Sequence, residues 1–123
     1  MSLTIIDQSL AKAEEMMKKY AYNDAEIKIV KEAILCHSCK DKLPKTKEGK
    51  ALATADAMAH MMTDFYLIMF FKRWLKAAKT YEEYRIWVLK KIERDFYTKM
   101  FYPEYRRKSK KRYEAIKTLF SVA

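Results

Sequence analysis

The residues best suited to chemistry lie close together, between Ala33 and His60. Both histidines and both cysteines of the chain fall inside this stretch, and His37 follows an apolar helical pattern. Asp56 lies among small and apolar neighbours, where a bare carboxylate would cost far more to bury than a surface helix returns. A metal, a cation or a hydrogen-bond network would supply the partner it needs. The alternative is that Asp56 lies on the polar edge of an amphipathic helix.

This stretch resembles a known family in the order of its motifs. The run VKEAILCHS is followed by a short polar loop with Pro44 and then by KTKEGKALATADAMAH. The order is similar to the second half of the HD-superfamily metal-dependent phosphohydrolase domain. In that domain a helix ending in AIxxHS precedes a P-x-T-x-E turn and a helix that carries an Ala-Asp pair. The resemblance covers about residues 7 to 70.

The resemblance implies hydrolysis of a phosphate ester, such as a nucleotide-like small molecule. Asp56 would be a metal ligand, and His37 would be a catalytic residue that contacts substrate phosphate or a second metal. The loop residues Lys40, Lys42 and Lys45 would steer the anionic substrate. The cofactor would be a divalent metal (Mn, Mg, Fe, Co or Ni), which lowers the pKa of a bound water that attacks phosphorus.

The chain also departs from the family pattern. It has no histidine before His37 and no His-Asp doublet, the feature that names the family. We therefore expect the C-terminal part of such a domain, truncated and inactive by itself, since a catalytic metal site needs several protein ligands. The apolar side chains of Ile34, Leu52, Met58 and Met62 would then be uncovered, which predicts self-association into a homo-oligomer.

A second constellation lies on the predicted third helix. Asp56, His60 and Asp64 recur at i, i+4 and i+8, so they share one helix face. His60 could bind a second metal. The favoured interpretation is structural, with His60 hydrogen-bonded to a neighbouring carboxylate, because i, i+4 pairs of this kind stabilise helices.

The pair Cys36 and Cys39 forms a C-x-x-C motif. A zinc site would need two more ligands, and a thioredoxin-like site would need a strand before the helix. Two half-buried thiols at a helix end are the favoured interpretation.

Composition predicts an all-α fold. The chain has one Gly and two Pro among 123 residues, and it shows no long alternation of apolar and polar residues. We expect a multi-helix bundle of about five helices that resembles part of an HD domain. The first expected helix covers residues 7–20 with an inner stripe that ends at Tyr20, the second is capped by Asn23, and the third covers residues 48–77 and is capped by Thr46. The fourth is capped by Thr80, and its inner stripe consists of Tyr84, Val88, Ile92, Phe96 and Met100. Pro103 begins the last helix, whose expected contacts are Tyr105, Tyr113, Ile116, Leu119 and Phe120.

Charge is uneven along the chain. Residues 1–63 carry ten basic and nine acidic side chains, whereas residues 64–123 carry sixteen and seven. We expect residues 1–78 to form the HD-like part and residues 79–123 a basic helical extension packed on it as one structural unit. The densest basic cluster comprises Arg106, Arg107, Lys108, Lys110, Lys111 and Arg112, alongside Tyr102, Tyr105 and Tyr113.

This basic cluster supports a second function class. Cations can neutralise phosphates while aromatic rings stack on bases, so the alternative is a non-catalytic basic helical module that binds nucleic acid or another acidic partner. A solvated basic helix without a partner is the favoured interpretation of the cluster, because no recognisable nucleic-acid module surrounds it.

The sequence also argues against a membrane partner. The longest unbroken apolar run, from Phe65 to Phe71, has seven residues, far short of the roughly 20 that span a bilayer. We expect no signal peptide, because the first residues are too polar for one. Two cysteines among many lysines favour a reducing, cytoplasmic location.

Overall fold

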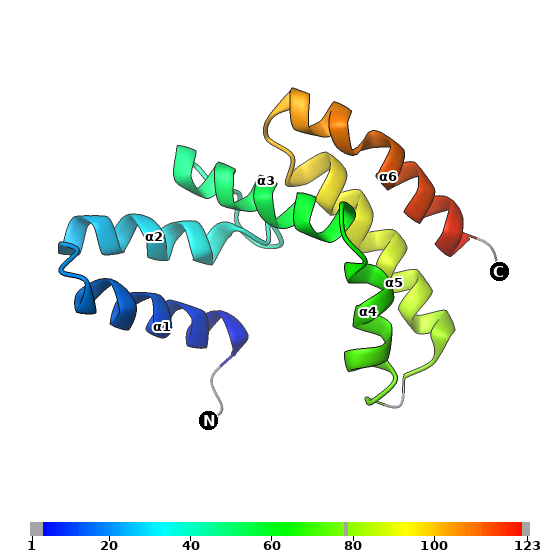
Figure 1. Cartoon of the computed structure of the whole chain (residues 1–123), viewed down its shortest axis with the longest axis horizontal. Coiled ribbons are helices and arrows are strands. Elements are labelled where there is room, and N and C mark those ends of the chain that lie inside the picture. Colours follow the sequence, from blue (N-terminus) through cyan, green and yellow to red (C-terminus); the bar gives the residue numbers. More distant parts are fainter. Residues whose placement is uncertain (1–3, 78, 122–123) are drawn as a thin grey trace. The chain divides into compact units, whose positions relative to one another are not determined.

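The computed structural model describes residues 4–77 and 79–121, and these residues form helices joined by short turns, with no strand among them. Its elements are α1 (Ile5–Lys19), α2 (Asp24–Cys36), α3 (Lys47–Met61), α4 (Phe65–Met69), the π-helix η1 (Phe70–Trp74), α5 (Tyr81–Glu93), the π-helix η2 (Arg94–Thr98) and α6 (Pro103–Ser121) (Figure 1). The prediction of an all-α, multi-helix fold is confirmed. No helix within the described residues is long and apolar enough to cross a membrane.

The helix starts follow local capping chemistry. Asn23 accepts the backbone N–H of Glu26 at 2.8 Å, and the Glu26 carboxylate accepts the Asn23 N–H at 3.1 Å. Thr80 likewise accepts the Glu83 N–H at 3.1 Å. These side chains satisfy N–H groups that have no partner inside the helix. Both predicted starts are therefore confirmed, whereas α1 begins earlier than expected, after a capping box between Thr4 and Asp7.

The long third helix expected over residues 48–77 is wrong, because the chain breaks after α3 and resumes at α4. Thr63 explains the break. Its hydroxyl donates to the carbonyl of Ala59 at 2.5 Å and accepts the N–H of Phe65 at 3.2 Å. A threonine side chain that takes over backbone partners offers the chain an alternative to the helix. Asp64 therefore begins a new helix and does not share one with Asp56.

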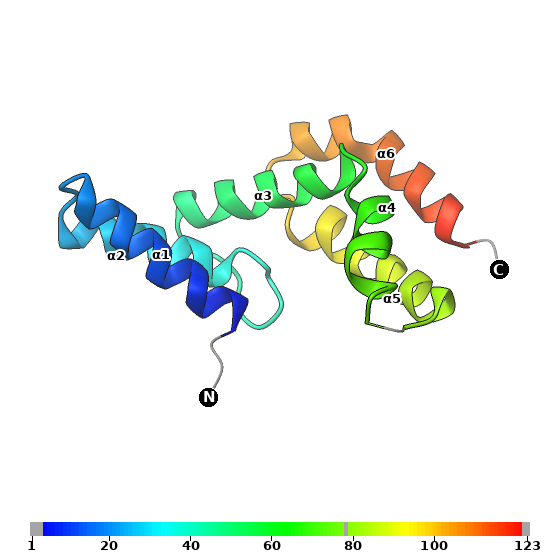
Figure 2. The same cartoon turned by 60° about the horizontal axis from the view of Figure 1, so that its bottom comes forward.

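The structure forms two compact units, Met1–Ala53 and Thr54–Ala123. The domain boundary expected after residue 78 remains a prediction, and residue 78 itself lies outside the described residues. In the first unit, α1 and α2 lie side by side as an antiparallel hairpin (Figures 1 and 2). None of the described α1 residues is buried, and Tyr20, which we expected on the inner stripe, is 68% exposed. Tyr20 caps the end of α1, where Ala21 turns the chain at φ 62°.

The main hydrophobic core lies in the second unit, where α5 and α6 run antiparallel and side by side (Figures 1 and 2). The predicted inner stripe of α5 is confirmed, because every member is buried. On α6 the expected contact from Leu119 is wrong, because its side chain is 54% exposed. Phe120 occupies the inner position instead and is 3% exposed. The core consists of Ala57, Met61, Tyr66, Tyr84, Val88, Ile92, Phe96, Met100, Tyr113 and Phe120.

Two π turns interrupt the helices of the second unit. The N–H of Leu75 donates to the carbonyl of Phe70 at 2.9 Å, and the N–H of Lys99 donates to that of Arg94, also at 2.9 Å. An α-helix has 3.6 residues per turn, so positions i, i+4 and i+8 drift around it. A wider π turn reduces this drift. Side chains spaced by four residues across a π turn therefore stay on one side of the helix.

Candidate functional site

Asp56, the predicted metal ligand, lies in the second unit on α3 and faces an ammonium group. Lys99 donates to Asp56 Oδ2 in a short hydrogen bond. His60 Nε2 lies 3.5 Å from Asp56 Oδ1. The Lys99 side chain is 1% exposed, whereas that of Asp56 is 29% exposed. The Asp56 carboxylate is thus partly exposed to solvent and is paired with the buried ammonium of Lys99.

Asp95, on η2, is the centre of the same group and has no exposed surface. The Tyr66 hydroxyl donates to Asp95 Oδ2 at 2.5 Å, and His60 Nδ1 lies 3.1 Å from the same oxygen. The other oxygen, Oδ1, faces Lys99 at 3.5 Å and Lys91 at 3.6 Å. We call this group the charge network; its members are Asp56, His60, Tyr66, Lys91, Asp95 and Lys99.

Local structure explains how the chain assembles the charge network. Lys91, Asp95 and Lys99 are spaced by four residues, and the π turn at η2 keeps them on one side of the helix. Thr54 then fixes the end of that helix on α3. Its hydroxyl donates to the Lys99 carbonyl at 3.2 Å and accepts the Phe101 N–H, also at 3.2 Å.

His60 is held from two sides. Its ring stacks on Phe65, with the centroids 4.1 Å apart. Its two nitrogens face the carboxylates of Asp56 and Asp95. Because both nitrogens are directed at carboxylates and one face of the ring is covered by Phe65, His60 acts as a bridge between α3 and η2.

Burial and charge oppose each other inside the network. Burial raises the pKa of Asp95, but the hydrogen bond from His60 and the charge of Lys91 outweigh it and hold that pKa below its usual value. Burial lowers the pKa of Lys91, against the attraction of Asp95. Burial also raises the pKa of the Tyr66 hydroxyl, and the adjacent Asp95 carboxylate raises it further. Asp95 therefore stays ionised and Tyr66 stays protonated at neutral pH.

The charge network fits a divalent metal poorly. A metal on Asp56 would meet the Lys99 ammonium, which is already hydrogen-bonded to Asp56 and lies 3.5 Å from Asp95. Within residues 4–77 and 79–121, no three His, Cys, Asp or Glu side chains are grouped so as to hold a metal ion. The metal roles of Asp56 and His60 stay predictions of the family resemblance.

His37, the predicted catalytic residue, belongs to the first unit, at the C-terminal end of α2. Its Nδ1 lies 2.5 Å from the carbonyl of Ile34, so this nitrogen caps the helix. Of the three lysines predicted to steer substrate, Lys42 and Lys45 line a cavity of about 730 Å³, together with Cys36 and Thr46, whereas Lys40 is exposed and is not among the lining residues. Cys36 is half-buried and Cys39 is buried.

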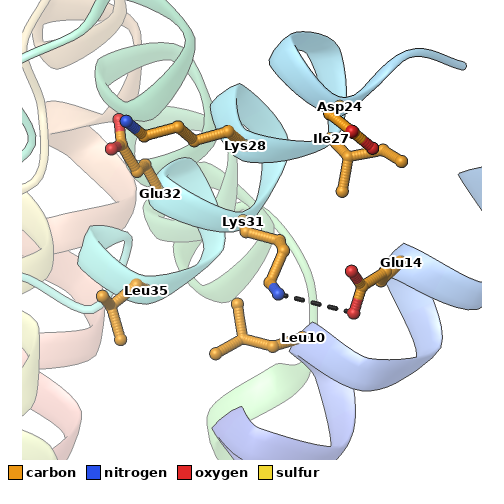
Figure 3. Close-up of a pocket in the computed structure, with 8 residues that line it drawn as sticks. All are labelled: Leu10, Glu14, Asp24, Ile27, Lys28, Lys31, Glu32 and Leu35. Carbon is orange, nitrogen blue, oxygen red and sulfur yellow. Dashed lines mark hydrogen bonds and ion pairs between the residues drawn. The ribbon is translucent and has the colours of Figure 1, made fainter.

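A second hollow of the first unit lies between α1 and α2 (Figure 3). This groove of about 360 Å³ has Leu10, Ile27 and Leu35 as its apolar part. Lys31 bridges the two helices across it with an ion pair to Glu14 at 3.5 Å. The charged residues Asp24, Lys28 and Glu32 also line the groove, so its apolar part is bordered by charges of both signs.

The basic cluster on α6 divides into two classes. Arg106 donates to the carbonyls of Phe96 at 3.3 Å and Met100 at 2.6 Å, and Arg112 donates to that of Met62 at 3.0 Å. These arginines satisfy carbonyls at helix ends, which lack partners within the helix. Arg107, Lys108, Lys110 and Lys111 are exposed, as Arg112 is, but none of these four donates to a backbone carbonyl of the described residues. Lys110 lies 3.9 Å from Glu114, and Lys108 lies over the ring of Tyr105 at 5.4 Å.

The tyrosines of α6 do not form the stacking surface that the sequence suggested. Tyr113 is 5% exposed and lies flat on Phe96, with centroids 4.2 Å apart. Its hydroxyl donates to Glu93. Tyr102 and Tyr105 are half-buried and pack edge to face at 6.1 Å. The exposed part of the cluster is therefore almost purely cationic.

Sequence reasoning missed Asp95, Lys99, Lys91 and Tyr66. The first three carried a signal, because a Lys-Asp-Lys series with a spacing of four is an alternating charge pattern on one helix side. Such a pattern usually indicates an exposed face, and only the packing against α3 and α4 places it inside.

Comparisons with family models, with curated proteins and with solved structures found no match for this chain. The HD assignment thus stays a prediction from the sequence motifs.

Proposed function

We propose that this chain is a non-catalytic helical module that binds the phosphate backbone of nucleic acid through α6. The observation that carries the proposal is the outward side of that helix. Arg107, Lys108 and Lys111 are exposed at positions i, i+1 and i+4, opposite the buried Ser109 and Tyr113. We call these three residues the α6 basic face.

The α6 basic face is available to an anion. Neither Arg107 nor Lys111 forms an ion pair with any residue that the structure describes, so no carboxylate has to be displaced from them. Residues 64–123 carry sixteen basic and seven acidic side chains, so the long-range field also attracts a polyanion. Each phosphate that is neutralised releases condensed counterions, which drives binding at low salt.

Binding of this kind would follow the backbone and not the base sequence. Sequence is recognised through base edges or stacked bases, and the three tyrosines beside the basic cluster, Tyr102, Tyr105 and Tyr113, are buried or half-buried. We therefore expect affinities that differ little between nucleic acids of different sequence.

The test is a salt titration with a labelled duplex, followed by fluorescence anisotropy. A variant with Arg107, Lys108 and Lys111 all changed to Gln should lower the slope of log K against log salt by about three, one for each lost phosphate contact. The matched control changes Lys19, Lys28 and Lys47 to Gln, which removes the same charge from exposed positions of the first unit.

An equal loss in the control would mean that only net charge matters and would contradict an α6 site. Absence of binding at low salt would also contradict it. If an acidic polypeptide such as polyglutamate bound more tightly than the duplex, the partner of α6 would be an acidic protein and not nucleic acid.

Phosphohydrolase activity is the second candidate, and one observation favours it. Lys42 and Lys45 line the cavity of about 730 Å³, where an anionic substrate could be held. The ammonium of Lys99 beside Asp56 speaks against it, because that position would have to accept the metal. Turnover of a generic phosphate ester with added metal is the deciding measurement.

A further inference from the structure

The helix formed by α4 and η1 exposes an unusual number of large apolar side chains. Leu67, Ile68, Phe71 and Leu75 are exposed to 52%, 39%, 62% and 55%. We call these four residues the apolar stripe. Their spacing of i, i+1, i+4 and i+8 places them on one side of the helix, and the π turn at η1 keeps Leu75 aligned with the others.

The opposite side of this helix is already used. Phe70 and Trp74 pack on Tyr84 of α5, with ring centroids 5.3 Å and 5.4 Å apart. Tyr66 is buried at 2% exposure. These residues are the ones that the helix contributes to the core, and the residues of the apolar stripe are additional to them. Contiguous exposed apolar surface of this kind marks interaction sites.

Charge beside the apolar stripe indicates the kind of partner. Residues 65–79 contain Lys72, Arg73, Lys76 and Lys79 and no carboxylate. The structure gives Lys72 and Lys76 no ion pair with any described residue, and both follow the stripe at one edge of the helix. Lys79 lies over the ring of Trp74 at 4.7 Å.

We propose that the apolar stripe and Lys72 and Lys76 together bind an acidic amphipathic helix of another protein. An apolar face on such a helix would cover the stripe, and carboxylates along one edge would pair with the two lysines, in the helix-to-surface mode that uses i, i+3, i+4 and i+7 anchors. A second copy of this chain is the wrong occupant, because its own stripe brings four cations and no carboxylate.

A helix fits this site better than an anionic membrane. The lysines border the apolar stripe on one side only, because the other side of the helix packs on α5. Interfacial helices carry cations on a broad polar face that lies toward the headgroups. Lys72 and Lys76, four residues apart, form a row that matches a row of carboxylates on a neighbouring helix.

The test uses the full chain and two synthetic helical peptides that share a leucine stripe and differ in one edge, which carries Glu in the first and Lys in the second. Binding is followed by the combined fluorescence of Trp74 and Trp87 and by calorimetry. We expect the Glu peptide to bind and the Lys peptide not to bind. Phe71→Glu and Leu75→Glu should each weaken binding about tenfold or more, as expected for central apolar anchors. The control, Leu43→Glu, alters a leucine of the first unit that is 57% exposed and should have no effect.

Charge reversal sharpens the test. The variant Lys72→Glu/Lys76→Glu should no longer bind the Glu peptide and should bind the Lys peptide, because its new carboxylates repel the first and attract the second. Circular dichroism melts of all variants check that they fold. Binding of vesicles of anionic lipid, abolished by Phe71→Glu, without binding of the Glu peptide would overturn the proposal in favour of a membrane surface. Binding of neither probe, or equal binding of both peptides, would also overturn it.

Discussion

The charge network and the α6 basic face are built from the same kinds of residue, yet their surroundings differ. In the network, Lys99 is 1% exposed and faces the carboxylates of Asp56 and Asp95. On α6, Arg107 and Lys111 are exposed and form no ion pair with any described residue. Lysines and arginines inside the protein therefore connect helices, whereas those outside remain available to a partner.

The energetic difference between the two regions is large. Removing an ion from water costs several kcal/mol, so a buried cation requires a partner and a change to that partner is severe. Exposed pairs contribute about 0 to 1 kcal/mol, so an exposed cation can be changed at little cost. The contrast is sharpest at Arg106 and Arg107, neighbours in the chain that belong to different classes.

The largest effect is expected at Asp95. Asp95→Asn removes the charge that faces Lys91 and Lys99, and breaking a buried pair in this way costs about 3 to 5 kcal/mol of unfolding free energy. Urea unfolding, followed by tryptophan fluorescence, measures it. Asp64→Asn is the matched control, because Asp64 is exposed and makes no side-chain capping bond, so a change within about 0.5 kcal/mol is expected. Equal losses at both positions would show that the network contributes nothing special.

Acid should weaken the protein through the same carboxylate. The pKa of Asp95 is lowered in the folded state, because the hydrogen bond from His60 and the charge of Lys91 outweigh the effect of burial. The unfolded chain therefore binds the proton first, at about pH 4. The stability that ionised Asp95 contributes is complete above that pH and is lost as the pH falls through the lower folded pKa.

Unfolding free energies between about pH 6 and pH 2 test this expectation. In Asp95→Asn the corresponding part of the fall should disappear. A smaller fall should remain, because the hydrogen bond from Tyr113 lowers the pKa of Glu93 in the same direction. An unchanged pH profile in the variant would separate acid sensitivity from the charge network.

An intermediate effect is expected where two adjacent arginines differ. Arg106→Gln removes hydrogen bonds to the carbonyls of Phe96 and Met100 and should cost about 1.5 to 3 kcal/mol, the range for bonds to charged groups. Arg107→Gln should change the unfolding free energy by less than about 0.5 kcal/mol. Nucleic-acid affinity should show the reverse order, with the larger loss at Arg107. The same order in both measurements would contradict the division of the basic cluster.

Much of the fold was predictable because its signals are local. Asn23 and Thr80 each carry their capping partner three residues on, and the inner stripe of α5 shows the helical period directly. The break after α3 was not predictable in this way. It depends on the hydrogen bonds of the Thr63 hydroxyl to the backbone of Ala59 and Phe65. A threonine inside a helical pattern does not always form such bonds.

The candidate site was predictable only in part. Sequence alone indicated that Asp56 needs a partner and offered a cation as one of three choices, and the structure places an ammonium there. The residue that supplies it, Lys99, is 43 positions away. Periodicity shows which side of a helix is apolar but not which distant side chain it meets. The same limit hid Asp95, whose burial depends on α3 and α4 packing over η2.

The smallest effect is expected from added divalent metal. Metal that binds the folded state alone raises its stability, but a metal at Asp56 would have to displace the Lys99 ammonium and leave that cation buried beside Asp95. Millimolar Mn²⁺ or Mg²⁺ should therefore leave the melting temperature unchanged and give no turnover of a phosphate ester.

The decisive control for metal is Asp56→Ala. If metal raised the melting temperature of the original chain but not of this variant, the carboxylate would be a ligand after all, and Lys99 would have to leave it. Turnover abolished by the same change would restore the phosphohydrolase hypothesis, with His37 and His60 the next residues to replace. A metal response that survives Asp56→Ala would instead arise at another place, because this variant lacks the carboxylate that accepts the hydrogen bond of Lys99.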